Sequence, residues 1–310
     1  MEPLGVGAMT TRGLAYWSAA VEGQRDVDPE AVAAMAGHPR FAEACWMIIA
    51  LSLARYGRNA GNTRFARDFS ALVYAYLVVY LDARGGITST AIIDLCREAG
   101  VASAGRARAI LFLLKRTGYI RADPANGDRR TRRYVASPEL RAAVCGIITD
   151  QLRAFALIEP DAGHAADRLV EDDFCRAFLL RFGESLIASV KARPVRPISL
   201  FTQCNAGTLI LFGILASAKA RDVYPPREAL RMSATELAQK HEVSRSHVSR
   251  LLREAERRGY LKRNADDQTG TIEEIFAREL IEFQTIIFTG LAHCCQYAFR
   301  ATAMEQVAAG

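Results

Sequence analysis

The sequence lacks most of the features by which enzymes and metal proteins are recognised. It contains no Gly-rich phosphate loop, no H-E-x-x-H segment and no G-x-S-x-G turn. Paired acids such as Asp172-Asp173 fall at predicted helix starts, and the five histidines are scattered along the chain. We therefore expect no enzymatic activity, no cofactor and no metal site.

Long apolar runs are also missing, as are cysteines at metal-binding spacing. The amino terminus has no basic segment followed by an apolar core, which a secretory signal would need. Seven cysteines, an odd number with no C-x-x-C, are typical of a reducing compartment. We therefore expect a cytoplasmic protein without a membrane partner. The main apolar runs all fall short of the about 18–20 residues that cross a bilayer: Ala44–Ala54, Phe69–Leu81, Ala206–Ala218 and Thr285–Phe299.

Proline is scarce, with 10 residues among 310. Apolar residues recur three and four positions apart almost throughout, and this period predicts a mainly α fold. Ser233-Ala-Thr-Glu236 and Thr271-Ile-Glu-Glu274 fit the capping box, and Ser137 stands before Pro138 as an N-cap before a first-turn proline. These three positions are predicted helix starts.

Two stretches of the chain resemble each other without a gap. SAGRARAILFLLKRTGYIRA begins at Ser103, and SRSHVSRLLREAERRGYLKR begins at Ser244. Each follows a short predicted helix and a long apolar one, Arg64–Ala83 or Asn205–Arg221, and each precedes another long helix. We interpret the chain as two related halves, and chance similarity between two amphipathic helices is the alternative.

The repeated pattern is a short helix, a turn, an amphipathic helix and then Gly-Tyr, which is typical of a winged helix-turn-helix. It predicts a mainly α fold with short β-wings, in which tandem winged helix-turn-helix domains pack through long flanking helices. The chain is then a monomeric pseudo-dimer or forms a homodimer. The predicted boundaries are an N-terminal extension 1–40, a first half 41–158, a linker 159–169, a second half 170–302 and a tail 303–310.

The second copy carries the clearest chemistry. Leu237 and Ala238 are predicted to pack inward, and Ser244 to cap the next helix, whose Leu251 and Leu252 face the core. The opposite face is the surface that a recognition helix lays into a major groove. An arginine on this face can form two hydrogen bonds to one guanine or one phosphate. The alternative is that this face contacts only other proteins. The predicted DNA-binding residues of this copy are Arg245, Ser246, His247, Ser249 and Arg250.

The first copy has fewer side chains that could contact DNA on its helix and more of them on its wing. Apart from Arg106 and Arg108, its helix offers little side chain for reading bases. Asn126-Gly127 lies where a two-stranded ribbon would turn. We expect the arginines that follow to contact phosphates or the minor groove, and a solvated charge run is the alternative. These arginines are Arg129, Arg130, Arg132 and Arg133.

Asp123-Pro124, Asp128-Arg129-Arg130 and Val135-Ala-Ser137-Pro138-Glu139 resemble the wing signature of the MarR family. The signature covers residues 88–140, and a looser winged-helix match covers 232–263. The resemblance implies a regulator that binds double-stranded DNA as a dimer and is released by a small-molecule effector or by cysteine oxidation. It also implies that Asp128 braces the wing and that Arg130 enters the minor groove.

Two features depart from the family pattern. The Asn126-Gly127 insertion lengthens the first wing, and the second wing, from Asn264 to Glu274, is acidic and is expected to be nearly absent. The second copy is therefore expected to read DNA by its helix alone. Family members carry one such unit each, so a single chain with two is expected to imitate their dimer.

His293-Cys294-Cys295 lies in an apolar helical stripe, where cysteine behaves as a small buried hydrophobe. Redox sensing by Cys294 and Cys295 is the alternative. Taken together, the sequence predicts a sequence-specific transcriptional regulator of double-stranded DNA. A replication initiator with tandem winged helices and a winged-helix protein-interaction scaffold are the alternatives.

The net charge of +6 is unevenly distributed. Residues 84–136 hold 11 basic and 4 acidic residues, and residues 227–263 hold 10 and 5. The rest of the chain therefore carries a net charge of −6. Two basic segments on an acidic frame would orient the protein on DNA.

Overall fold

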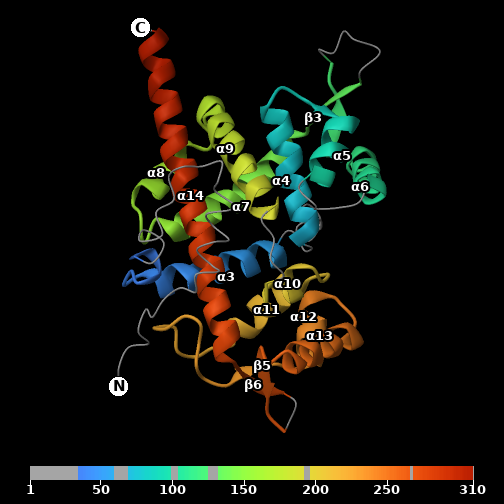
Figure 1. Ribbon diagram of the computed structural model, residues 1–310, viewed down its shortest axis with the longest axis vertical. Coiled ribbons are helices and arrows are strands. Elements are labelled where there is room, and N and C mark those ends of the chain that lie inside the picture. Colours follow the sequence, from blue (N-terminus) through green and yellow to red (C-terminus); the bar gives the residue numbers. More distant parts are fainter. Residues whose placement is uncertain are drawn as a thin grey trace.

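The computed structural model describes residues 34–58, 69–98, 104–124, 132–191, 196–265 and 268–309. Most of them are helical, and two small antiparallel sheets of three strands each complete the structure (Figure 1). The prediction of a mainly α protein with short strands is confirmed. Within these ranges, no helix combines the length and the apolar character that crossing a bilayer requires.

The elements follow one another along the chain in two successions. The first consists of α3 (Phe41–Arg58), α4 (Phe69–Ala83), β1 (Ile87–Thr88), α5 (Ser89–Glu98), α6 (Ala104–Arg116), β2 (Ile120–Ala122), β3 (Arg133–Ala136) and α7 (Pro138–Phe155). The second consists of α8 (Asp161–Arg168), α9 (Asp172–Lys191), α10 (Ser199–Thr202), α11 (Gly207–Leu215), β4 (Leu230–Arg231), α12 (Ala234–His241), α13 (Arg245–Arg257), β5 (Leu261–Arg263), β6 (Thr269–Ile272) and α14 (Glu274–Ala309).

One order of elements occurs twice. Residues 69–136, called unit 1 below, run helix, strand, helix, helix, strand, strand, and residues 207–272, called unit 2, repeat this order. In both sheets the third strand lies between the first and the second, as β1-β3-β2 and β4-β6-β5. Helix α6 and strand β2 coincide residue for residue with α13 and β5 in the gapless alignment.

The helix ends follow from local chemistry. Ser137, Ser233 and Ser244 each accept a hydrogen bond at their side chains from the backbone N–H three residues later, which starts α7, α12 and α13. Gly118 and Gly259 follow α6 and α13 with φ of +76° and +70°, a conformation that glycine adopts without a steric penalty. Both kinds of boundary were predictable from sequence.

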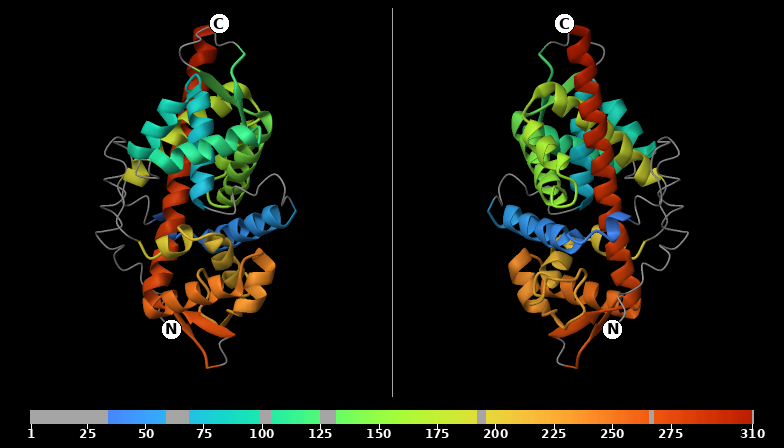
Figure 2. Two further views of the ribbon diagram at one scale, coloured as in Figure 1. Left: turned by 90° about the vertical axis from the view of Figure 1, so that its right-hand side faces the viewer. Right: turned by 90° about the vertical axis from the view of Figure 1, so that its left-hand side faces the viewer.

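Helix α14 runs along the long axis of the molecule, and the two sheets lie near opposite ends of that axis, with α3 between them (Figures 1 and 2). Halfway along α14, Phe288 stacks on Phe155 of α7, with ring centroids 5.2 Å apart, and meets Phe41 of α3 edge-on at 6.0 Å. All three rings are buried. This cluster joins three helices from distant parts of the chain.

Two further contacts connect unit 2 to α3 and α14. Trp46 of α3 lies edge-on against Tyr224, with ring centroids 5.6 Å apart, and its Nε1–H donates to the carbonyl oxygen of Val223. At the start of α14, Phe276 stacks between Tyr260 and Phe201, at 5.4 Å from each. The turn after α13 is therefore fixed against both α10 and α14.

The predicted linker 159–169 contains helix α8, whose alanines are buried and which packs on α7. Helix α9, assigned by sequence to the second half, packs on α4 as well as on α14. The halves therefore share one apolar core, because the helices assigned to one half bury their apolar faces against the other. The apolar helix expected over Asn205–Arg221 is shorter and ends at Leu215.

Two predictions about residues 264–274 are wrong. Thr271 does not start a helix, since it lies in β6 and α14 begins at Glu274. The second wing is also not nearly absent, because β6 pairs with β5 from Leu261↔Ile272 to Arg263↔Gly270. Asn264 supports the hairpin, as its backbone N–H and its Nδ2 donate to the carbonyl and Oγ1 of Thr269 at 2.9 and 2.8 Å.

The Phe288 cluster predicts a large stability effect. Phe288→Ala removes a fully buried ring that three helices share, and we expect the free energy of unfolding to fall by about 3–5 kcal/mol in urea titrations. Met304→Ala is the control, because that side chain is 73% exposed on the same helix and its loss should cost less than about 0.5 kcal/mol. Equal losses for the two variants would contradict the central role of the cluster.

Candidate nucleic-acid interface

Helix α13 is held by its apolar stripe. Val248, Leu251, Leu252 and Ala255 are 0–3% exposed, as the sequence predicts. Before it, Leu237 and Ala238 of α12 are buried, and Glu242 turns the chain in a left-handed conformation with φ of +51°. The two helices are thereby fixed to the core, and the first turns of α13 are left at the surface.

Two arginines on the exposed face of α13 have no partner in the part of the chain that the structure describes. Arg245 and Arg250 are exposed, and neither forms an ion pair or hydrogen bond within the described part of the chain. Ser246 is exposed beside them, and its Oγ lies 3.1 Å from the Oγ of Ser244. Their positive charge is therefore available to a ligand, and the positive end of the helix dipole adds to it.

Arginines at the other end of α13 are neutralised. Arg257 and Arg258 both bind the carboxylate of Glu254, and Arg263 of β5 binds Glu256 at 2.7 Å. Hydrogen bonds from Arg257 and then from Arg258 lower the pKa of Glu254 to about 2, so this carboxylate stays charged at any physiological pH. Among the described residues, the arginines of α13 without an ion pair are therefore Arg245, Arg250 and Arg253, all before Glu254, and Arg253 donates to the carbonyl oxygen of Ser249.

Two predicted contact residues of unit 2 are less accessible than expected. His247 and Ser249 are half-buried, and the Nε2 atom of His247 lies 3.0 Å from the carbonyl oxygen of Asn205. The imidazole therefore connects α13 to the loop between α10 and α11. The helical periodicity of the sequence places His247 on the outer face of α13. That periodicity carries no information on the position of the loop that contains Asn205.

Unit 1 presents a different helix face. Arg108 of α6 is exposed and has no partner among the described residues, whereas the side chain of Arg106 lies outside the described residues. Phe112 and Leu113 are 65% and 54% exposed. In the alignment of the two units they stand where α13 has Arg253 and Glu254. Helix α6 therefore offers apolar surface where α13 offers charge.

The wing of unit 1 is described at its base only. Asp128, Arg129 and Arg130 lie outside the described residues, as does the Asn126-Gly127 tip. Arg132 and Arg133 are exposed at the start of β3, where no other described residue forms an ion pair with them. The structure therefore describes two of the four predicted wing arginines, and both face solvent.

Contacts that the sequence did not predict hold this wing. The Lys115 ammonium lies 4.0 Å from the centre of the Tyr134 ring of β3 and donates to the hydroxyl of the same tyrosine at 2.8 Å. The carboxylate of Asp82 accepts the backbone N–H of Ala136 at 3.1 Å and the guanidinium of Arg141 at 2.6 Å. These contacts join residues of α4, α6 and α7 to one another or to strand β3, and no local pattern indicates them.

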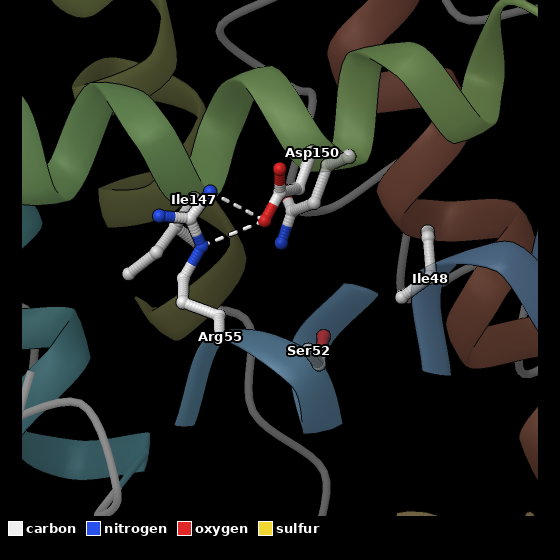
Figure 3. Close-up of a pocket in the computed structure, with 6 residues that line it drawn as sticks. Ile48, Ser52, Arg55, Ile147 and Asp150 are labelled. Atoms are coloured by element: carbon white, nitrogen blue, oxygen red, sulfur yellow. Dashed lines mark hydrogen bonds and ion pairs between the residues drawn. The ribbon is translucent and has the colours of Figure 1, made fainter. Parts of the chain in front are cut away.

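A groove runs beside α13, lined by Leu200, Cys204, His247, Arg250, Leu251, Arg253, Glu254 and Arg257. Its lining combines the apolar side chains of Leu200 and Leu251 with three arginines and Glu254. A second, smaller pocket lies between α3 and α7 (Figure 3). There Arg55 donates to Asp150 at 2.6 Å and to the carbonyl oxygen of Gly146 at 2.7 Å, so its charge is already balanced by the protein. The small pocket therefore has a structural role.

The cysteine pair singled out by sequence is packed in the core. Cys294 and Cys295 are 0% and 3% exposed, and burial raises the pKa of both thiols, that of Cys295 to about 12. The structure thus gives no support to redox sensing at these residues. Across the described ranges, no three His, Cys, Asp or Glu side chains cluster as metal ligands would.

No protein-family model, no curated protein and no solved structure matches the chain. Function is therefore inferred from the geometry of the molecule and the chemistry of its surface.

The cap of α13 yields a prediction about this surface. Ser244→Ala removes the side chain that accepts the His247 N–H at 3.2 Å, and we expect it to lower the free energy of unfolding by about 1 kcal/mol in urea titrations. Ser246→Ala is the matched control, because Ser246 is equally exposed but leaves that cap intact. A loss as large in the control would contradict the assignment of Ser244 as the cap.

Proposed function

We propose that the chain is a sequence-specific regulator of transcription that binds double-stranded DNA through two winged-helix units of MarR-like type. The main support is the surface of α13, whose buried stripe leaves Arg245 and Arg250 exposed and, among the residues that the structure describes, without a partner. The repeated order of elements, with the third strand in the middle of each sheet, further supports two units of one kind.

The mode of contact follows from dimensions. An α-helix with side chains is about 10–12 Å across, and the major groove is about 12 Å wide. The first turns of α13 leave Arg245, Ser246 and Arg250 exposed, so these turns enter the groove first. Arg245 and Arg250 then donate to guanine or phosphate, and Ser246 contributes a hydroxyl group.

The two units contribute to DNA binding in different ways. Helix α6 of unit 1 begins with Ala104 and Gly105 and has few groups that read a base, so unit 1 acts through Arg108, Arg132 and Arg133. These guanidinium groups contact phosphates or a minor groove of suitable width. Unit 2 then supplies sequence preference, and unit 1 supplies affinity and orientation.

The first test compares arginine pairs on duplexes selected from a random library. Changing Arg245 and Arg250 together to Ala should weaken binding to the selected duplex by about 1–3 kcal/mol per bidentate contact and relax the sequence preference. Fluorescence anisotropy with selected and scrambled duplexes measures both effects.

Two control pairs sharpen the result. Replacing Arg257 and Arg258, which are already paired with Glu254, should change affinity and preference far less. Replacing Arg132 and Arg133 should weaken binding to all duplexes alike. An equal loss of sequence preference in that variant would refute the assignment of sequence preference to unit 2.

Two other outcomes would favour the alternative functions. Protection of directly repeated origin elements would indicate a replication initiator. The absence of binding to any duplex would indicate a protein-interaction scaffold.

Salt dependence is the second test. With roughly six phosphate contacts, the logarithm of the binding constant should fall with the logarithm of salt concentration at a slope of about −5, because bound counterions are released. Anisotropy titrations between about 50 and 200 mM salt measure this slope. Affinity that does not change with salt would count against electrostatic docking on DNA.

A further inference from the structure

The thiols of Cys145 and Cys175 are in contact across two helices. Cys145 lies in α7 and Cys175 in α9, and their Sγ atoms are 3.6 Å apart. Both are free cysteines, and all seven cysteines of the chain lie in the described residues. Sulfurs at this distance must approach by about 1.5 Å to form a disulfide of about 2.05 Å.

The pair is also reachable. Cys145 is half-buried, and Cys175 lines a cavity of about 230 Å³ together with Asp82, Gly85, Arg141 and Arg176. A water molecule occupies about 30 Å³, so the cavity has room for a small reagent. Cys175 is itself buried at 7% exposure, so the half-buried Cys145 is the thiol of the pair that a reagent meets first, and Cys45, Cys96, Cys294 and Cys295 are 0–3% exposed.

We propose that Cys145 and Cys175 form a modification site, a dithiol that peroxides oxidise reversibly to an intrachain disulfide. The Cys145 thiolate attacks one oxygen of the peroxide, the O–O bond breaks, and hydroxide or alkoxide leaves and takes up a proton. Cys145 is then a sulfenic acid. The Cys175 sulfur attacks this sulfur, the S–O bond breaks and water leaves, so the two thiols lose the two electrons that the peroxide gains.

The surroundings assign the two roles. Cys145 is the more exposed thiol of the pair, and its hydrogen bond with Cys175 and the nearby charge of Arg141 lower its pKa, whereas that hydrogen bond and burial raise the pKa of Cys175. Arg141 lies one helical turn before Cys145 on α7. Cys145 is therefore the attacking thiol, Cys175 the resolving thiol, and Arg141 a positioning residue.

The site is connected to the base of the first wing. Arg141 binds Asp82, and Asp82 accepts the N–H of Ala136 in β3. Closing a bond between α7 and α9 moves the helix that carries Arg141, so oxidation should alter the position of the wing. This consequence, unlike the thiol chemistry, rests on the proposed function.

The decisive experiment uses the full chain, reduced and then treated with stoichiometric hydrogen peroxide. We expect a mass decrease of about 2 Da, loss of two of the seven thiols, and one crosslinked peptide pair containing Cys145 and Cys175, all reversed by a thiol reductant. Cys175→Ser should stop at a sulfenic acid on Cys145 that a 1,3-dione reagent traps, and Cys145→Ser should form neither product.

Two further variants separate chemistry from structure. Cys204→Ser, which removes another half-buried thiol, should oxidise like the unmodified chain. Arg141→Gln should react several-fold more slowly, and Arg141→Lys, which keeps the charge, should recover most of the rate. A disulfide between other cysteines or between two chains, or unchanged oxidation of Cys145→Ser, would overturn the proposal. Circular dichroism checks that each variant is folded.

The effect of oxidation on DNA binding is measured in a separate experiment. Oxidised and reduced chain should differ at least several-fold in affinity for a selected duplex, and Cys145→Ser should abolish the difference. Equal affinities would overturn the link to the wing, whereas a chain that binds no DNA in either state would overturn the proposed function and leave the thiol result standing.

Discussion

Burial of aromatic side chains along α14 is the constraint on which the other contacts depend. Phe288 is enclosed by Phe41 of α3 and Phe155 of α7, and Phe276 by Tyr260 and Phe201. A helix of 36 residues extends about 54 Å, so one element can contact both ends of the molecule. Its apolar residues lose contact with water when α3, α7 and α9 pack on it together with the Tyr260 turn of unit 2, and α9 in turn packs on α4 of unit 1, so the two similar segments share one core.

Charge is arranged on this frame in two ways. Where arginines have a structural task they are paired, as Arg196 is with Glu279 and Glu282 at 2.9 Å in a largely buried site. Desolvation raises the pKa of Glu279, and its hydrogen bonds to Arg196 oppose that effect. Arg245 and Arg250 have no such partner among the described residues, which is why they carry the proposed interface. An unpaired exposed guanidinium keeps its full capacity for bidentate contact with a phosphate or a base.

Much of the fold could be predicted from local patterns. The apolar stripe of α13, the serine caps and the glycines after α6 and α13 were all expected, since each depends on residues within one or two turns. The errors lie where distant segments meet. Asp161–Arg168 forms helix α8 because α7 offers an apolar surface to its alanines, and Thr271 extends a strand because β5 lies beside it. The polar or acidic composition of these segments does not reveal that α7 or β5 packs against them.

For the candidate sites, the sequence by itself determined which residue types stand on which helix face: arginines in the first turns of α13, alanine and glycine in those of α6, and cysteines along α7 and α9. Only the tertiary structure decided which of them are free and which meet. It turned His247 toward Asn205 and brought Cys145 to Cys175 across 30 positions of sequence. The physical reason is that periodicity fixes the direction of a side chain relative to its own helix, whereas contact between helices depends on how their apolar faces pack.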